Sequence, residues 1–173
     1  MKERIEQQLS VLVGLPLFRA GRAVDLEWFE FGEPHKRTRR DGMSIDVGEY
    51  ALHLQCAWRI RAAHEIVVAS HDLYYPPGDS PDRPDDFDWD VPNGNRRDHR
   101  MNSFLQEYAS YPLIVTAVEA DEVGGIKVSF TNNLVLDVFP DNSFTDADLE
   151  HWRFFRLNGD VSHFVVTGYR IQE

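Results

Sequence analysis

The residues with most potential for chemistry lie in one aspartate-rich segment. Between positions 79 and 90 the chain carries six aspartates, and two aromatic residues are interspersed among the last of them. Aromatic anchors surrounded by carboxylates suit docking on a basic protein surface. The sequence therefore predicts a partner-binding surface. Its members are Asp85, Asp86, Phe87, Asp88, Trp89 and Asp90.

The same carboxylates raise the alternative of a calcium site, because Ca²⁺ takes oxygen ligands. Asp86, Asp88 and Asp90 have the spacing that opens an EF-hand loop. The match then fails, since Val91 stands where that loop needs glycine and Arg97 where it needs a bidentate glutamate. We predict no metal site here, and a solvated acidic loop remains the simplest alternative to partner binding.

Polar residues on both sides of this segment predict a second kind of site. If they converge, they would line a cleft between the two halves of the chain, suited to a small ligand or to the chemistry of a small enzyme. Neighbouring residues on a strand face opposite sides, so an adjacent His-Asp pair cooperates only within a turn. The candidate cleft residues are His71, Asp72, Arg96, Arg97 and His99.

Sequence motifs for catalysis are otherwise missing. None of the seven histidines has metal-ligand spacing, and the chain contains no nucleophile elbow, phosphate-binding loop or dinucleotide fingerprint. The single cysteine, Cys56, lies in an alternating apolar run, which predicts a buried and unreactive thiol. We therefore assign no catalytic residue and no cofactor, and binding is favoured over catalysis.

The charge of the chain narrows the partners further. A net charge of −11 disfavours nucleic acid and favours a basic protein, such as a nuclease with a positively charged cleft. One basic run, residues 35–40, is expected to be a loop or hairpin tip. The N-terminus lacks the apolar region of a signal peptide, and no stretch is long enough to span a bilayer. These features predict a cytoplasmic protein without a membrane partner.

The two ends of the chain look like loose copies of one β unit. Trp58-Arg59 and Trp152-Arg153 each lie inside an apolar segment that is followed by a second strand-like run. This repetition predicts two related sheets, or one sheet built twice. We expect each tryptophan in the core and each arginine on the other face, paired with carboxylates such as Glu27 or Asp137.

Hydrophobic periodicity places the remaining elements. Apolar spacing predicts a helix over residues 2–13, and alternation predicts strands over 24–28 and 51–58 and a hairpin over 126–139. A final hairpin is expected around residues 158–159, with one helical turn near 145–149.

Together these elements predict an α+β fold of antiparallel sheets, with a short N-terminal helix and one central helix. We expect a single domain, 1–173, made of two halves (15–75 and 112–170). A Pro/Asp-rich loop (76–100) and a helix (101–109) join the halves. Exposed strands pairing across a two-fold axis would make a homo-oligomer.

Several short segments carry a resemblance that covers most of the chain. They are residues 20–25, 52–60, 72–76, 94–98 and 163–168. In these the chain resembles a family of uncharacterised small bacterial proteins, which implies no catalytic residue. In residues 139–141 and 150–155 it also resembles β-rich immunity proteins encoded beside bacterial polymorphic toxins. That resemblance implies a protein partner.

Overall fold

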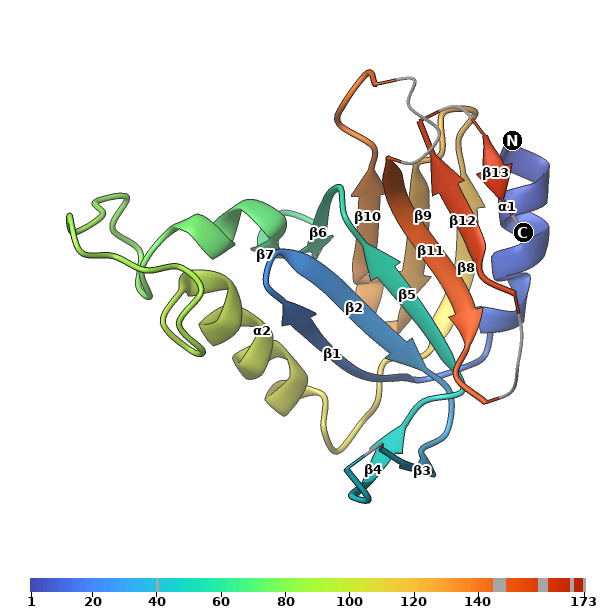
Figure 1. Cartoon of the computed structure of the whole chain (residues 1–173), viewed down its shortest axis with the longest axis horizontal. Coiled ribbons are helices and arrows are strands. Elements are labelled where there is room, and N and C mark those ends of the chain that lie inside the picture. The colour runs from blue at the N-terminus through green and yellow to red at the C-terminus, as the bar shows by residue number, and fades with distance from the viewer. Residues whose placement is uncertain (40, 145–148, 159–161, 169, 173) are drawn as a thin grey trace.

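Two antiparallel sheets lie face to face with the hydrophobic core between them (Figure 1). This computed structural model describes residues 1–39, 41–144, 149–158, 162–168 and 170–172. The six-stranded sheet has the order β1 (Leu17–Ala23), β2 (Leu26–Phe31), β5 (Tyr50–Leu54), β11 (Glu150–Arg156), β12 (Phe164–Thr167) and β13 (Ile171–Gln172). The five-stranded sheet has the order β7 (Ile66–Ala69), β6 (Ala57–Arg61), β10 (Val135–Phe139), β9 (Ile126–Phe130) and β8 (Val115–Ala120).

Smaller elements complete the fold. A two-stranded ribbon projects from the six-stranded sheet. One helix packs against β8, and the other packs against β7 and β1, so the helices lie at opposite edges of the five-stranded sheet. These elements are β3 (His35–Thr38), β4 (Ser44–Val47), α1 (Lys2–Leu9), α2 (Arg96–Glu107) and the 3₁₀ turns η1 (Ser10–Leu12), η2 (Ser70–Tyr74) and η3 (Thr131–Asn133). The predicted α+β class, with one N-terminal and one central helix, is confirmed. Within the described residues, no helix is long and apolar enough to cross a membrane.

Alternating side chains form the core, as the sequence pattern predicts. In β9 the residues Ile126, Val128 and Phe130 are buried, while the residues between them face outward. Phe29 of β2 meets Trp58 of β6 edge to face, with ring centroids 5.5 Å apart, and so joins the two sheets. Helix α1 adds apolar residues to the same core.

Each sheet combines strands from both halves of the chain. β5 pairs with β11 in one sheet, and β6 pairs with β10 in the other. Neither of the two large sheets is therefore formed by one half alone, and the two copies of the Trp-Arg pair lie in different sheets. Within each large sheet, strands that are distant in sequence are thus neighbours.

Both tryptophans of the repeat are buried, and the two arginines face outward. Arg59 pairs with Asp137 at 2.9 Å, as expected, whereas Arg153 pairs with Glu150. Glu27, the other carboxylate proposed for these arginines, has a different partner, which is described below.

Three boundaries differ from the sequence prediction. The predicted strand 51–58 is broken at residues 55–56, where the chain leaves one sheet for the other. The predicted strand 24–28 begins at Leu26, because Val24, with φ of 59°, forms the turn of the β1–β2 hairpin. The central helix begins at Arg96, before the predicted 101. The helical turn predicted near 145–149 falls mostly outside the described residues.

Candidate binding surface

An extended arm, residues 76–94, projects from the sandwich between η2 and α2 (Figure 1). It contains six aspartates and one arginine, so it carries a net charge of −5 out of the −11 of the whole chain. Five prolines within it disfavour both helix and strand. The arm is therefore held by side chains at its two ends rather than by backbone ladders.

Helix α2 begins with a cap that also holds the end of the arm. The side chain of Asn95 accepts a hydrogen bond from the Asp98 amide at 2.8 Å, the usual role of an N-cap residue. Its amide nitrogen donates to the carbonyl of Trp89 at 2.8 Å. Asn95 is fully buried, so the helix start and the arm end are fixed by one side chain.

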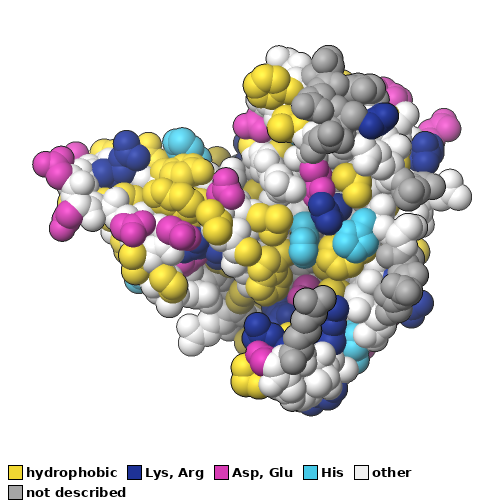
Figure 2. Space-filling model, in the orientation of Figure 1, with side chains coloured by type: hydrophobic (Ala, Val, Ile, Leu, Met, Phe, Trp, Pro, Cys, Tyr) yellow, Lys and Arg dark blue, Asp and Glu magenta, His cyan; other side chains and the backbone are white. Residues whose placement is uncertain are grey.

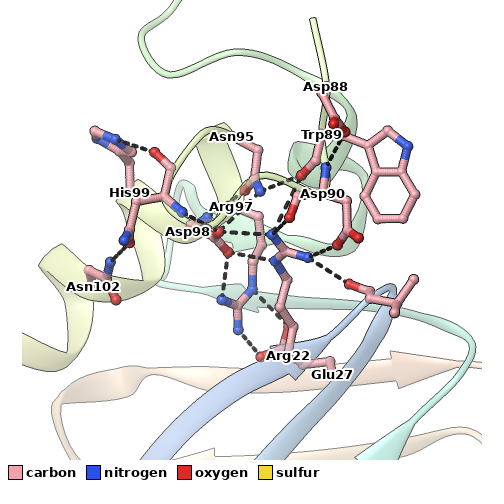
Figure 3. Close-up of polar contacts among 12 residues, drawn as sticks. Arg22, Glu27, Asp88, Trp89, Asp90, Asn95, Arg97, Asp98, His99 and Asn102 are labelled. Atoms are coloured by element: carbon pink, nitrogen blue, oxygen red, sulfur yellow. Dashed lines mark hydrogen bonds and ion pairs between the residues drawn. The ribbon is translucent and has the colours of Figure 1, made fainter.

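Arg22, at the end of β1, joins the sheet to both the arm and the helix (Figure 3). Its guanidinium donates to both carboxylate oxygens of Asp98, at 2.9 and 3.1 Å, and to the Asp90 carboxylate at 2.9 Å. It also donates to the backbone carbonyl of Asp90 at 3.2 Å. One planar group thus ties three elements together.

Beneath this contact the buried Glu27 carboxyl and the Arg97 guanidinium form a hydrogen-bonded pair. Arg97 of α2 donates through two nitrogens to both carboxylate oxygens of Glu27 on β2, and through a third to Asp98 at 3.1 Å. Both Glu27 and Arg97 are almost completely buried. Separating α2 from the sheet would leave a buried polar group without its partner, which is strongly unfavourable. This contact therefore holds α2 against the sheet.

The carboxyls of this cluster have opposite pKa shifts. Burial, offset in part by Arg97, raises the pKa of Glu27 to about 8. Burial also acts to raise the pKa of Asp98, but hydrogen bonds from Arg22 and from the Asn93 amide outweigh it and lower the pKa overall. Asp98 is therefore the constant anion on which the two arginines converge.

The start of the arm is held from the other side of α2. Arg96 donates to the carbonyl of Ser80 at 2.6 Å and lies over the ring of Tyr75, and Arg100 pairs with Asp79 at 3.0 Å. Both ends of the arm are thus bonded to the first turns of one helix.

Of the predicted partner-binding residues, Asp85, Asp86, Phe87 and Asp88 lie between the two fixed ends. Trp89 and Asp90 form one of these ends, and the Asp90 carboxylate is paired with Arg22. Asp85, Asp86 and Asp88 are exposed, and none of the three is ion-paired with another described residue. Acidic side chains line the projecting arm beside an apolar cluster (Figure 2). Trp89 packs edge to face on Tyr74, with centroids 5.6 Å apart, so it stiffens the arm rather than standing free.

The predicted cleft residues do not converge on one cavity. His71 lines a cavity of about 200 Å³ together with Cys56, while Arg96 and His99 line another of about 310 Å³. Arg97 is enclosed in the pair described above, and Asp72 accepts the Ala69 amide at 2.9 Å and so stabilises η2. The five side chains lie in four separate local environments.

The sequence predicts a buried thiol at Cys56, and this is confirmed. The thiol is buried, and desolvation, with the nearby Asp141, raises its pKa to about 12. A thiol with this pKa is not a nucleophile near neutral pH. Among the described residues, no three His, Cys, Asp or Glu side chains are grouped to hold a metal ion.

Sequence reasoning missed Asn95 and Arg22, which organise the root of the arm. The signal for Asn95 was available, because an Asn followed three residues later by an acidic residue is a helix start. Arg22 carried no local signal, since its partners are 68 and 76 residues away along the chain.

In comparisons with known proteins, no family model, curated protein or solved structure matches the chain.

Proposed function

We propose that this protein acts by binding a basic protein partner, in an immunity-like or regulatory role, and that the arm is its docking element. The observation that carries the proposal is the set of exposed carboxylates of Asp85, Asp86 and Asp88, which form no ion pair with another described residue, on an arm fixed at both ends. The resemblance to immunity proteins of toxin systems points in the same direction.

The fixed ends favour binding in two ways. An arm whose backbone is already held at both ends loses less conformational entropy on association, which leaves more of the contact energy for affinity. A negative surface that projects from the body also accelerates the approach of a positive partner at low ionic strength. Phe87, half-buried among these carboxylates, supplies an apolar contact of the kind that anchors interfaces.

The alternative, a small-ligand binder or small enzyme with its site at His71, Asp72, Arg96, Arg97 and His99, has less support. These residues are separated in the folded chain, and Arg97 and Asp72 are engaged in structural bonds. A cleft site built from these residues would need Arg97 and Asp72, whose side chains already form bonds within the fold.

The experiment is capture of partners from host lysate by three tagged proteins. They are the wild type, a variant with Asp85, Asp86 and Asp88 changed to lysine, and a control with Glu3, Glu33 and Glu65 changed to lysine. The control residues are exposed and lie outside the arm, so both variants have the same net charge.

We expect one basic protein to be retained by the wild type and the control and lost by the arm variant. With that partner purified, the arm variant should associate at least about tenfold more slowly at low salt, and the difference should shrink as salt rises. Equal loss in both variants would show that only total charge matters, and equal retention would remove the arm from the interface.

A further inference from the structure

We infer that a cavity between α1 and the ends of β5, β11 and β12 binds a small organic anion with an aromatic or apolar body. The cavity has a volume of about 520 Å³, within the range of small-molecule sites. Its sheet residues come from β5, β11 and β12, whereas α2 and the arm contact the edge strand β1 of the same sheet. The inference therefore does not depend on the proposed partner.

The walls of the cavity supply a flat apolar surface. Tyr50 stacks on Phe154 with centroids 5.5 Å apart and planes 12° from parallel. Phe154 and Phe164 are almost completely buried, so the accessible apolar lining comes from the half-buried rings of Tyr50 and Phe155. An aromatic ring at the wall of a cavity can contact another ring or an apolar chain. From α1, Gln7 and Gln8 present side-chain amides to the same space.

The charge of this cavity is unusual for so acidic a chain. Arg4 and Arg156 line it, and none of the described residues around it is a carboxylate. In each of four further cavities at least one Asp or Glu forms part of the wall. A protein of net charge −11 thus has one described cavity whose charged lining is only cationic.

Arg156 is the group we expect to meet the anion. Its guanidinium lies 6.0 Å from the centre of the Tyr50 ring, and no described carboxylate pairs with it. By contrast, Arg19, Arg59 and Arg153, on the faces of the two large sheets, are each bonded to a carboxylate. A guanidinium above an aromatic wall pairs with a carboxylate or sulfonate while the ligand body stacks beneath it.

The test is titration of the whole ¹⁵N-labelled protein with 2-naphthoate, followed by NMR. The matched cation 2-naphthylmethylammonium has the same ring system and the opposite charge. We expect saturable shifts of the Gln7 and Gln8 signals with naphthoate, with a dissociation constant on the order of 1 mM for a ligand of this size. Arg156→Gln should weaken binding about tenfold, and Arg156→Lys should weaken it less.

Arg37→Gln is the matched control, because Arg37 is exposed on β3 and is not part of the cavity lining. It should bind like the wild type, as should the arm variant described above. Three results would overturn the inference: no saturable shift at Gln7 and Gln8, equal binding of the cation, or unchanged affinity in Arg156→Gln. Failure of the arm to bind a partner would leave these outcomes unaffected.

Discussion

Glu27 gives the stability of this protein a pH dependence that one substitution should remove. Its carboxyl is 2% exposed, and burial, offset in part by Arg97, raises its pKa from 4.5 to about 8. Between these pH values the folded protein holds a proton that the unfolded chain releases. The contribution of Glu27 to stability is thus fully present below pH 4.5 and is lost as the pH rises through about 8. The change is about 5 kcal/mol over the whole window, and roughly 3–4 kcal/mol between about pH 5 and about pH 8.

The assay compares urea unfolding of the wild type and Glu27→Gln from about pH 5 to about pH 8 by tryptophan fluorescence. Glutamine has the shape of the neutral carboxyl but does not titrate. We expect the stability of the wild type relative to the variant to fall by roughly 3–4 kcal/mol over this range. Burial lowers the pKa of His53 and His151, so both add stability as the pH rises, but they are common to both proteins and cancel. A difference that stays constant within about 1 kcal/mol would mean that Glu27 is ionised throughout, which refutes the reasoning.

Three further substitutions test the packing around this cluster and the core. Arg97→Met leaves the buried Glu27 carboxyl without its donors and should cost about 2–4 kcal/mol in the free energy of unfolding; adding Glu27→Leu should recover most of the loss. Gly21→Val should cost about 1–3 kcal/mol and shift the fluorescence of Trp28, because a Cβ at Gly21 would lie 2.3 Å from that ring. Trp152→Phe should cost about 2–4 kcal/mol by calorimetry, since it leaves a void and removes a 2.7 Å bond to a carbonyl in the β8–β9 turn. Unchanged stability in any of these would contradict the contact on which it rests.

The parts of the fold that could be predicted are those in which apolar and polar residues alternate over a few positions. The hairpin over 126–139 was found because apolar residues alternate on both sides of Asn132 and Asn133, which adopt positive φ in the turn. The break at 55–56 was missed because the alternation continues across it. Only the pairing of β5 with β11 and of β6 with β10 shows that the chain changes sheets there.

The candidate surface was predicted only in part, because local composition shows which residues are acidic but not what holds them in place. Composition alone indicated an exposed acidic segment, and its carboxylates are exposed. What holds the segment in place could not be predicted, because Arg22 and Glu27 come from a hairpin far from α2 in sequence. Because Arg96 and Arg97 are adjacent in sequence, we predicted that they would line the same cleft. On successive positions of one helix their side chains point in different directions, Arg96 to the arm and Arg97 to Glu27.

The interleaving of strands has a consequence for how the chain folds during synthesis. β5 lies between β2 and β11, and its pairing of Leu54 with Trp152 joins residues about a hundred positions apart. Contacts at such separation slow folding, into the range of roughly milliseconds to seconds for β-rich domains. Until β11 leaves the ribosome, one edge of β5 has no partner, and an unpaired edge can join another chain. The nascent first half is therefore the species most exposed to aggregation.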